Sequence, residues 1–249
     1  MPFLESAVIA AFLAFCRIGG CFMLMPGLAS IRVPTNVRLF VAVAVSFALL
    51  VHLWENFAAV VDPSPVILLP MVVSELLIGA LIGLLARFYL LAMQFMAAAI
   101  SFLSGLGGMP GQGIEEPDAQ TPMAGIISLS ALILLFALDF HHLIIEALVA
   151  SYTLAPLNVM FDPQGALTDL ADTLREAFFV VLRLGSPFVA YAILVNLAAG
   201  LINKLSPQIP VYFVSLPFVI AGALILAYFS FGTMIGLFAD GFAAATIDR

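Results

Sequence analysis

Residues 65–104, PVILLPMVVSELLIGALIGLLARFYLLAMQFMAAAISFLS, form one apolar run of 40 residues. A helix that crosses a membrane needs about 20 residues, because each residue adds about 1.5 Å. A continuous helix here would be about 60 Å long, roughly twice the thickness of the hydrocarbon layer. No turn signal appears between Leu84 and Leu90. The run therefore contains either a hidden hairpin near Arg87 or a long helix that extends beyond the bilayer and packs against other proteins.

The composition of the whole chain agrees with a membrane location. Hydrophobic residues make up 64% of the 249 residues and charged residues only 9%, whereas soluble domains carry roughly 25% charged residues. The net charge of −7 argues against a nucleic-acid-binding protein. The apolar runs are continuous rather than alternating, which favours helices over a barrel. We predict an all-α integral membrane protein with about six segments in long, kinked hairpins, at 6–31, 37–61, 65–104, 121–155, 174–204 and 210–239.

Polar side chains interrupt several of these runs, namely Arg17, Glu75, Arg87, Arg183, Asn196 and Lys204. A charge at the centre of a bilayer costs about 2.5–3.5 kcal/mol on insertion scales, so each one needs a partner or water. One interpretation is pairing within the chain, for example of Glu75 with Arg17 or Arg87. The other is a path for a solute or ion lined by these charges. Gly79 and Gly83 form a small-xxx-small pattern, which permits close helix packing.

The sequence gives little support for a catalytic site or a metal site. Asp139, His141 and His142 could titrate or bind a metal, but adjacent histidines lie about 100° apart on a helix, so we expect no metal site. No nucleotide, dinucleotide or hydrolase fingerprint is present. We therefore predict a protein that is not an enzyme and has no cofactor.

A polar segment, GLGGMPGQGIEEPDAQTP, divides the apolar chain at residues 105–122. It holds five glycines, three prolines and three carboxylates. Glycine and proline disfavour helix, and glycine keeps the backbone deformable. This segment is therefore predicted to be a non-helical loop between two apolar parts of the chain.

Four stretches carry a resemblance to a known family: RIGGCFMLMPGLASIRVPTNVR (17–38), ELLIGALIGLLARFYLLAMQF (75–95), FHHLIIEALVASYTLAP (140–156) and NKLSPQIPVYFVSLPFVIAGALIL (203–226). Together they resemble the FliR family of the flagellar type III export apparatus, in the family's order and over nearly the whole chain. The resemblance implies a structural channel subunit that completes and closes the export gate through which unfolded flagellar proteins cross the inner membrane. It implies a multi-pass protein at the flagellar basal body.

The family also implies partners and an internal organisation. The expected partners are FliP-like and FliQ-like gate subunits, FlhB-like and FlhA-like export components, the exported flagellar proteins and membrane lipid. The chain would form a single FliR-like membrane domain over residues 1–249. Residues 1–156 would resemble a FliP-like part, and residues 174–239 would resemble a FliQ-like helical hairpin.

Site residues follow from the resemblance position by position. The residues expected to act in packing and assembly are Arg17, Pro26, Arg38, Glu75, Gly79, Gly83, Lys204, Pro207, Gln208 and Pro217. The central loop of the family enters the pore and helps to plug it, and by position this loop is 105–121. Its expected plug residues are Gly105, Gly107, Gly108, Met109, Pro110, Gly111, Gly113, Ile114, Glu115, Glu116 and Pro117.

The loop departs from the family in its chemistry. Family loops often carry apolar or aromatic residues, whereas in the stretch 108–118 Met109 and Ile114 are the only large apolar residues. The alternative function is a subunit of a small-solute transporter or permease, which the charges within the apolar runs would suit. Such a protein usually has a midplane site at broken helices in two related halves, and no such repeat is visible in the sequence.

Overall fold

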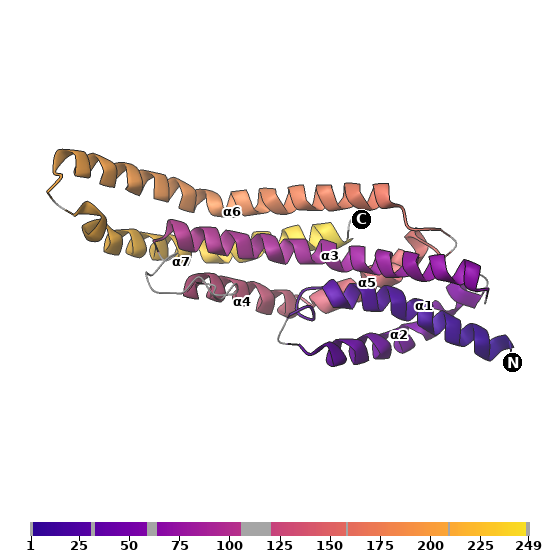
Figure 1. The fold of residues 1–249 in the computed structure, drawn as a ribbon. Helices are drawn as coiled ribbons and strands as arrows, with labels where there is room; N and C mark the ends of the chain where they lie inside the picture. Colours follow the sequence, from indigo (N-terminus) through magenta and orange to yellow (C-terminus); the bar gives the residue numbers. More distant parts are fainter. Residues whose placement is uncertain are drawn as a thin grey trace. The chain divides into compact units, whose positions relative to one another are not determined.

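The computed structural model describes residues 2–30, 33–58, 64–105, 121–157, 159–208 and 210–247. Every regular element in these ranges is an α-helix, which confirms the predicted fold class (Figure 1). The helices are α1 (Pro2–Leu24), α2 (Thr35–Ala58), α3 (Pro65–Leu103), α4 (Pro122–Ala137), α5 (Phe140–Leu154), α6 (Pro163–Leu205) and α7 (Val211–Ile247). Within these ranges five helices are long and apolar enough to cross a membrane, and the bent pair of α4 and α5 would add a sixth.

Helix α3 decides between the two interpretations of the long apolar run. It is one helix of 39 residues that passes through Arg87 without a turn, so the hairpin alternative is wrong. At 1.5 Å per residue it measures about 58 Å, close to twice the hydrocarbon thickness. Helix α6 has 43 residues and by the same rule measures about 64 Å. Both helices are therefore too long to lie upright within the hydrocarbon layer alone.

Two boundaries differ from the sequence prediction. The apolar segment 121–155 is broken between α4 and α5, which meet at 61°, because Asp139 has a left-handed backbone (φ 56°) that ends the helical path. Helix α6 begins at Pro163, well before the apolar segment that was predicted to start at residue 174. The Asp162 side chain accepts hydrogen bonds from the backbone N–H groups of Gln164 (3.0 Å) and Gly165 (3.1 Å) and caps this start.

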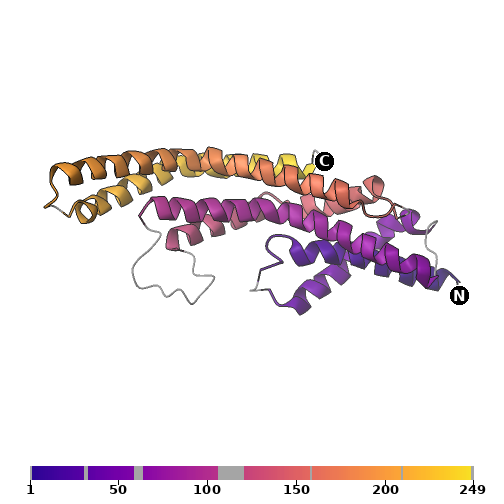
Figure 2. The ribbon, with the colours of Figure 1, turned by 45° about the horizontal axis from the view of Figure 1, so that its top comes forward.

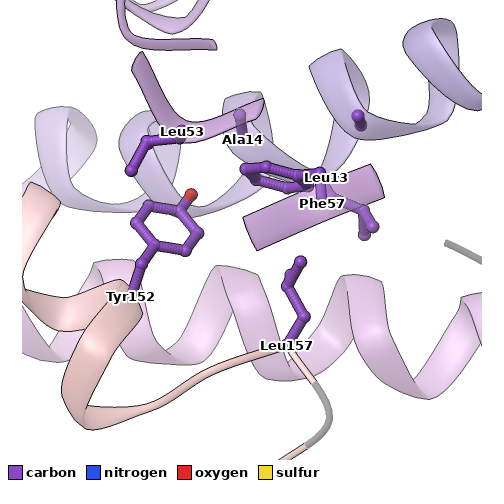
Figure 3. Packing of buried hydrophobic residues seen from close by; sticks show 7 residues of the cluster. Leu13, Ala14, Leu53, Phe57, Tyr152 and Leu157 are labelled. Carbon is purple, nitrogen blue, oxygen red and sulfur yellow. The ribbon is translucent and has the colours of Figure 1, made fainter. Parts of the chain in front are cut away.

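The chain divides into two compact units, and the first comprises Met1–Tyr89, Asp139–Leu174 and Ala244–Arg249. In this unit α1 and α2 form an antiparallel hairpin (Figure 2). Its core is a cluster of buried side chains from α1, α2, α5 and the segment after α5 (Figure 3). The members are Ala10, Leu13, Ala14, Leu53, Phe57, Tyr152 and Leu157. Burial of these apolar groups holds the three helices together.

The second unit comprises Leu90–Leu138 and Arg175–Ala243. Within it the described parts of α6 and α7 run side by side as an antiparallel hairpin (Figures 1 and 2). The Tyr191 hydroxyl on α6 donates one bifurcated hydrogen bond to the backbone carbonyls of Phe218 (3.1 Å) and Val219 (3.2 Å) on α7. Gly222 on α7 leaves room for the Tyr191 ring, since a Cβ at this position would overlap the tyrosine hydroxyl. One tyrosine therefore joins the two arms of the hairpin.

Candidate functional site: a buried ionic cluster

Arg17 on α1 is the centre of a charged cluster inside the first unit. Its side chain has no exposed surface, and the side chain of Glu75 on α3 is only 3% exposed. The Arg17 Nε donates to Glu75 Oε2 and the Nη2 donates to Glu75 Oε1, each at 2.7 Å. This is a bidentate pair, the arrangement in which a guanidinium and a carboxylate match best. Of the two partners considered for Glu75, the structure shows Arg17.

Helix α5 and the residue after it complete the shell around the guanidinium. Arg17 Nη1 donates to Ser151 Oγ at 2.9 Å, and Nη2 donates to the carbonyl oxygen of Ala155 at 2.8 Å. The Tyr152 ring lies with its centroid 3.9 Å from Arg17 Cζ, within the range of a cation–π interaction. The charge is therefore neutralised by one carboxylate and solvated by groups from α5. Burial of an ion pair is tolerated only when such further hydrogen bonds are present.

Ser151 and Tyr152 connect the charged cluster to the rest of the unit. Ser151 Oγ also donates to the carbonyl oxygen of Leu148 at 2.7 Å, so its hydroxyl both donates and accepts. The Tyr152 ring packs against Phe57 on α2 with centroids 5.4 Å apart and belongs to the apolar core in Figure 3. The cluster thus joins α1, α3 and α5 directly and touches α2 through one aromatic contact.

Glycines explain why α1 and α3 approach closely enough for the pair to form. A Cβ on Gly79 would overlap the carbonyl group of Arg17, and a Cβ on Gly83 would overlap the carbonyl group of Cys21. Gly20 on α1 meets the backbone of α3 in the same way. The backbones are therefore in direct contact, as small-xxx-small patterns allow. One turn before Gly79 on the same helix, the side chain of Glu75 reaches Arg17.

Arg38 and Pro26 lie at the connection between α1 and α2. Pro26 is buried in the turn that follows α1. Arg38, in the first turn of α2, donates from Nη2 to the carbonyl oxygens of Ser30 and Val33, and from Nε to Val33 at 3.1 Å. Its guanidinium thus satisfies backbone carbonyls of the connection, so this arginine acts locally in the structure.

The other predicted packing residues lie in the hairpin of α6 and α7. Lys204 is exposed in the last turn of α6, where a cation interacts favourably with the helix dipole. Pro207 and Gln208 are exposed in the turn after α6, and Pro217 is an exposed residue inside α7. None of these four belongs to the Arg17 cluster.

The predicted plug residues fall almost wholly outside the described residues. Gly105 follows α3 and has a left-handed backbone (φ 74°), a conformation that glycine adopts without strain. The remaining ten, from Gly107 to Pro117, lie in the range 106–120, which the structure does not describe. On the far side, Thr121 caps α4 by accepting a hydrogen bond from Ala124 N at 3.3 Å.

The sequence did not identify the α5 partners of Arg17. Ser151 and Tyr152 lie in one of the four stretches that carry the family resemblance, 134 and 135 positions from Arg17, and no pattern linked them to it. A serine beside a tyrosine in an apolar helix is a signal for a polar contact, but it names no partner. The carbonyl oxygen of Ala155 has no sequence signature at all.

The chain is similar to known proteins over most of its length. The profile of the family described as bacterial export proteins, family 1, matches residues 8–245. The chain is 29% identical to the flagellar biosynthetic protein FliR of Caulobacter vibrioides, over 88% of each chain. It is 26% identical to the FliR of Aquifex aeolicus, over 91% of this chain and 86% of that one. It is also 26% identical to the FliR of Bacillus subtilis, over 87% of this chain and 84% of that one.

Proposed function

The chain belongs to family 1 of the bacterial export proteins, the FliR family, and from this premise we propose that it is a structural subunit that completes and closes a protein export gate. Its family makes it an export component of flagellar biosynthesis, and its apolar helices make it a multi-pass membrane protein. The proposal adds the inner membrane at the basal body, the gate itself, and passage of unfolded flagellar proteins. The chain would contribute channel wall rather than catalysis.

The observation that carries the proposal is the length of α3 combined with its apolar character. The candidate span within it covers Val66–Leu103, 38 residues. Of an apolar stretch of 18 residues in this span, only 28% is buried inside the chain. A helix of that length exceeds the hydrocarbon layer about twofold. Apolar surface outside the lipid must be covered by protein. Other subunits are therefore needed to cover it, which supports an assembly over a solitary protein.

The hairpin of α6 and α7 supports the same conclusion. The buried share of an apolar stretch of 18 residues is 6% in α7 and 22% in α6, whereas it is 56% in α1. Large apolar side chains such as Phe213, Phe218 and Tyr228 are at least 74% exposed. We propose that FliP-like and FliQ-like subunits cover these faces together with lipid, and that FlhB-like and FlhA-like components join the same apparatus.

The internal organisation proposed for the chain follows the family. Residues 1–156 would act as the FliP-like part and residues 174–239 as the FliQ-like hairpin. The break between the two compact units at Leu174 and Arg175 falls at the proposed start of that hairpin. The first unit, however, also includes Asp139–Leu174, so the beginning of α6 would belong structurally to the first part.

We propose that the loop at 105–121 is the movable closure of the gate. Its two ends are defined by Gly105 and by the Thr121 cap of α4. Between them the sequence holds Gly and Pro residues, which resist helix formation, together with three acidic residues. A segment of this kind can occupy a pore and still deform when a polypeptide passes. Met109 and Ile114 would supply its apolar contacts.

The transporter alternative rested on charges within the apolar runs. Arg17 and Glu75 neutralise one another and form hydrogen bonds within the chain, so the two charges that are buried together offer no free group to a solute. No observation on the described residues favours that alternative.

Deletion of the coding sequence tests the proposed function. Hook and filament proteins should disappear from the medium, and a plasmid copy of the chain should restore their export. Uptake of small solutes by the same cells should stay unchanged. Normal export of flagellar proteins in the deletion strain would contradict the proposal, and a selective loss of solute uptake would favour the transporter.

A further inference from the structure

The break between α4 and α5 brings three potential metal ligands together. Asp139, His141 and His142 each offer one ligand atom, and these atoms all lie within 4.8 Å of one another. Asp139 Oδ1 lies 3.9 Å from His141 Nε2, and the two imidazole centroids are 4.7 Å apart. The three side chains therefore converge on one small volume at the point where the apolar segment bends.

The rings lie closer together than the sequence argument led us to expect. Adjacent residues on a helix point about 100° apart, and on that basis we predicted no shared ion. The angle between the two Cβ directions does not fix the distance between the rings, however, because each imidazole turns about two side-chain bonds. At the start of α5 these two rings turn toward one another.

The backbone of Asp139 indicates that its carboxylate is not there to cap the helix. Asp139 occupies the N-cap position of α5, yet its side chain makes no capping hydrogen bond. Aspartate at this position usually accepts a bond from one of the first backbone N–H groups. Its backbone is left-handed (φ 56°), a conformation that among non-glycine residues is adopted mainly by asparagine and aspartate.

We propose that Asp139, His141 and His142 bind one divalent transition-metal ion, with zinc as the native ion. Two imidazoles and one carboxylate suit zinc, whereas magnesium and calcium prefer sets of oxygen ligands. Zinc bonds of about 2.0–2.2 Å hold tetrahedral ligand atoms about 3.4 Å apart. From at most 4.8 Å, each pair of atoms must close by about 1.4 Å or less, which side-chain rotation can supply. Water would occupy the fourth position.

The surroundings of the cluster permit an ion to enter. The side chain of Asp139 is 74% exposed and that of His141 is 43% exposed, so neither ligand must be uncovered first. The bound ion would connect the residue before α5 to the first turn of α5. The site would then hold Asp139 against the first turn of α5.

Zinc content of the purified assembly tests the proposal. The assembly is extracted from native membranes through a tag on this chain, stripped with a chelator, incubated with zinc chloride and dialysed. Bound zinc is counted by mass spectrometry, and its affinity is measured by competition with a chromogenic chelator. His141→Ala, His142→Ala and Asp139→Asn should each weaken zinc binding by at least about tenfold. His52→Ala, which removes the exposed histidine on α2, should leave it unchanged.

Two further outcomes separate a metal site from a structural effect. His142→Cys should retain zinc, because thiolate is also a zinc ligand, while His142→Ala should lose it at an equal yield of assembly. Cobalt added in place of zinc should give the visible absorption of a tetrahedral site in the wild type and not in His142→Ala. Equal zinc content in the wild type and in the variant that lacks all three ligands would overturn the proposal.

Discussion

The guanidinium of Arg17 and the carboxylate of Glu75 form a bidentate ion pair between α1 and α3, with two hydrogen bonds of 2.7 Å. The residues are 58 positions apart, and glycines at the same crossing bring the two backbones into contact. Both charges are almost completely removed from solvent. The pair therefore fixes the packing of α1 against α3, and its loss should destabilise the whole first unit.

Glu75→Ala should destabilise the protein strongly. The substitution leaves the Arg17 charge buried without its carboxylate, and removal of one partner of a buried pair costs on the order of 3–5 kcal/mol. We expect a lower thermal midpoint of the purified assembly, less assembly in the membrane and impaired motility. Normal flagella together with an unchanged midpoint in this variant would exclude a buried pairing role.

The double variant Arg17→Met with Glu75→Leu is the matched control. Replacement of a complete buried pair by apolar residues of similar volume is often neutral or stabilising. The double variant should therefore be more stable than either single variant, even though it carries more changes. If the change in midpoint of the double variant equals the sum of the changes in the two single variants, Arg17 and Glu75 act independently.

Gly79→Ala and Gly83→Ala should separate α1 from α3. The added methyl group would overlap a backbone carbonyl of α1 at each position, and overpacking of this kind typically costs about 1–3 kcal/mol. Gly125→Ala and Gly200→Ala are controls, since a Cβ there meets nothing within 4 Å in the chain. Thermal midpoints of the four variants decide the matter. Equal losses at all four positions would mean that the α1–α3 crossing has no special role.

Tyr152 should tolerate loss of its hydroxyl but not loss of its ring. The hydroxyl has no hydrogen-bond partner among the described residues, whereas the ring covers the Arg17 guanidinium and packs on Phe57. Tyr152→Phe should leave the thermal midpoint of the assembly nearly unchanged. Tyr152→Leu should lower the midpoint, because loss of the cation–π interaction alone costs about 0.5–2 kcal/mol of stability. A larger drop in the midpoint for Tyr152→Phe than for Tyr152→Leu would show that the hydroxyl, and not the ring, supplies the stability.

Removal of residues 109–114 tests the proposed closure. The deletion takes out Met109 and Ile114, the apolar residues through which the loop would seal. Membranes that contain the assembled gate should then leak ions, measured as conductance across a planar bilayer. A variant with residues 109–114 replaced by an equal number of Gly and Ser residues controls for loop length. Unchanged conductance in the deletion would exclude a plugging role for this loop.

The sequence predicted most of the helices, and it offered the pairing of Glu75 with Arg17 as one of two possibilities for that carboxylate. The bounds of the run 65–104 match those of α3 almost to the residue, because an apolar segment in lipid forms helix, but the sequence left open whether this helix is continuous or turns near Arg87. The polar start of α6 was missed because hydropathy detects membrane spans rather than helices. The break at Asp139 was missed because neither proline nor glycine marks it. The contacts of Arg17 with Ser151 and Ala155 depend on tertiary packing, which a local pattern does not encode.

Native co-purification with mass determination tests the central claim most directly. A tag on this chain should recover one complex that contains FliP-like and FliQ-like subunits, with a mass far above the 26.5 kDa of the chain. Expressed without those partners, the chain should aggregate in detergent, because its exposed apolar faces are left uncovered. A monodisperse protein of 26.5 kDa that carries no partner and binds a small solute would contradict the account.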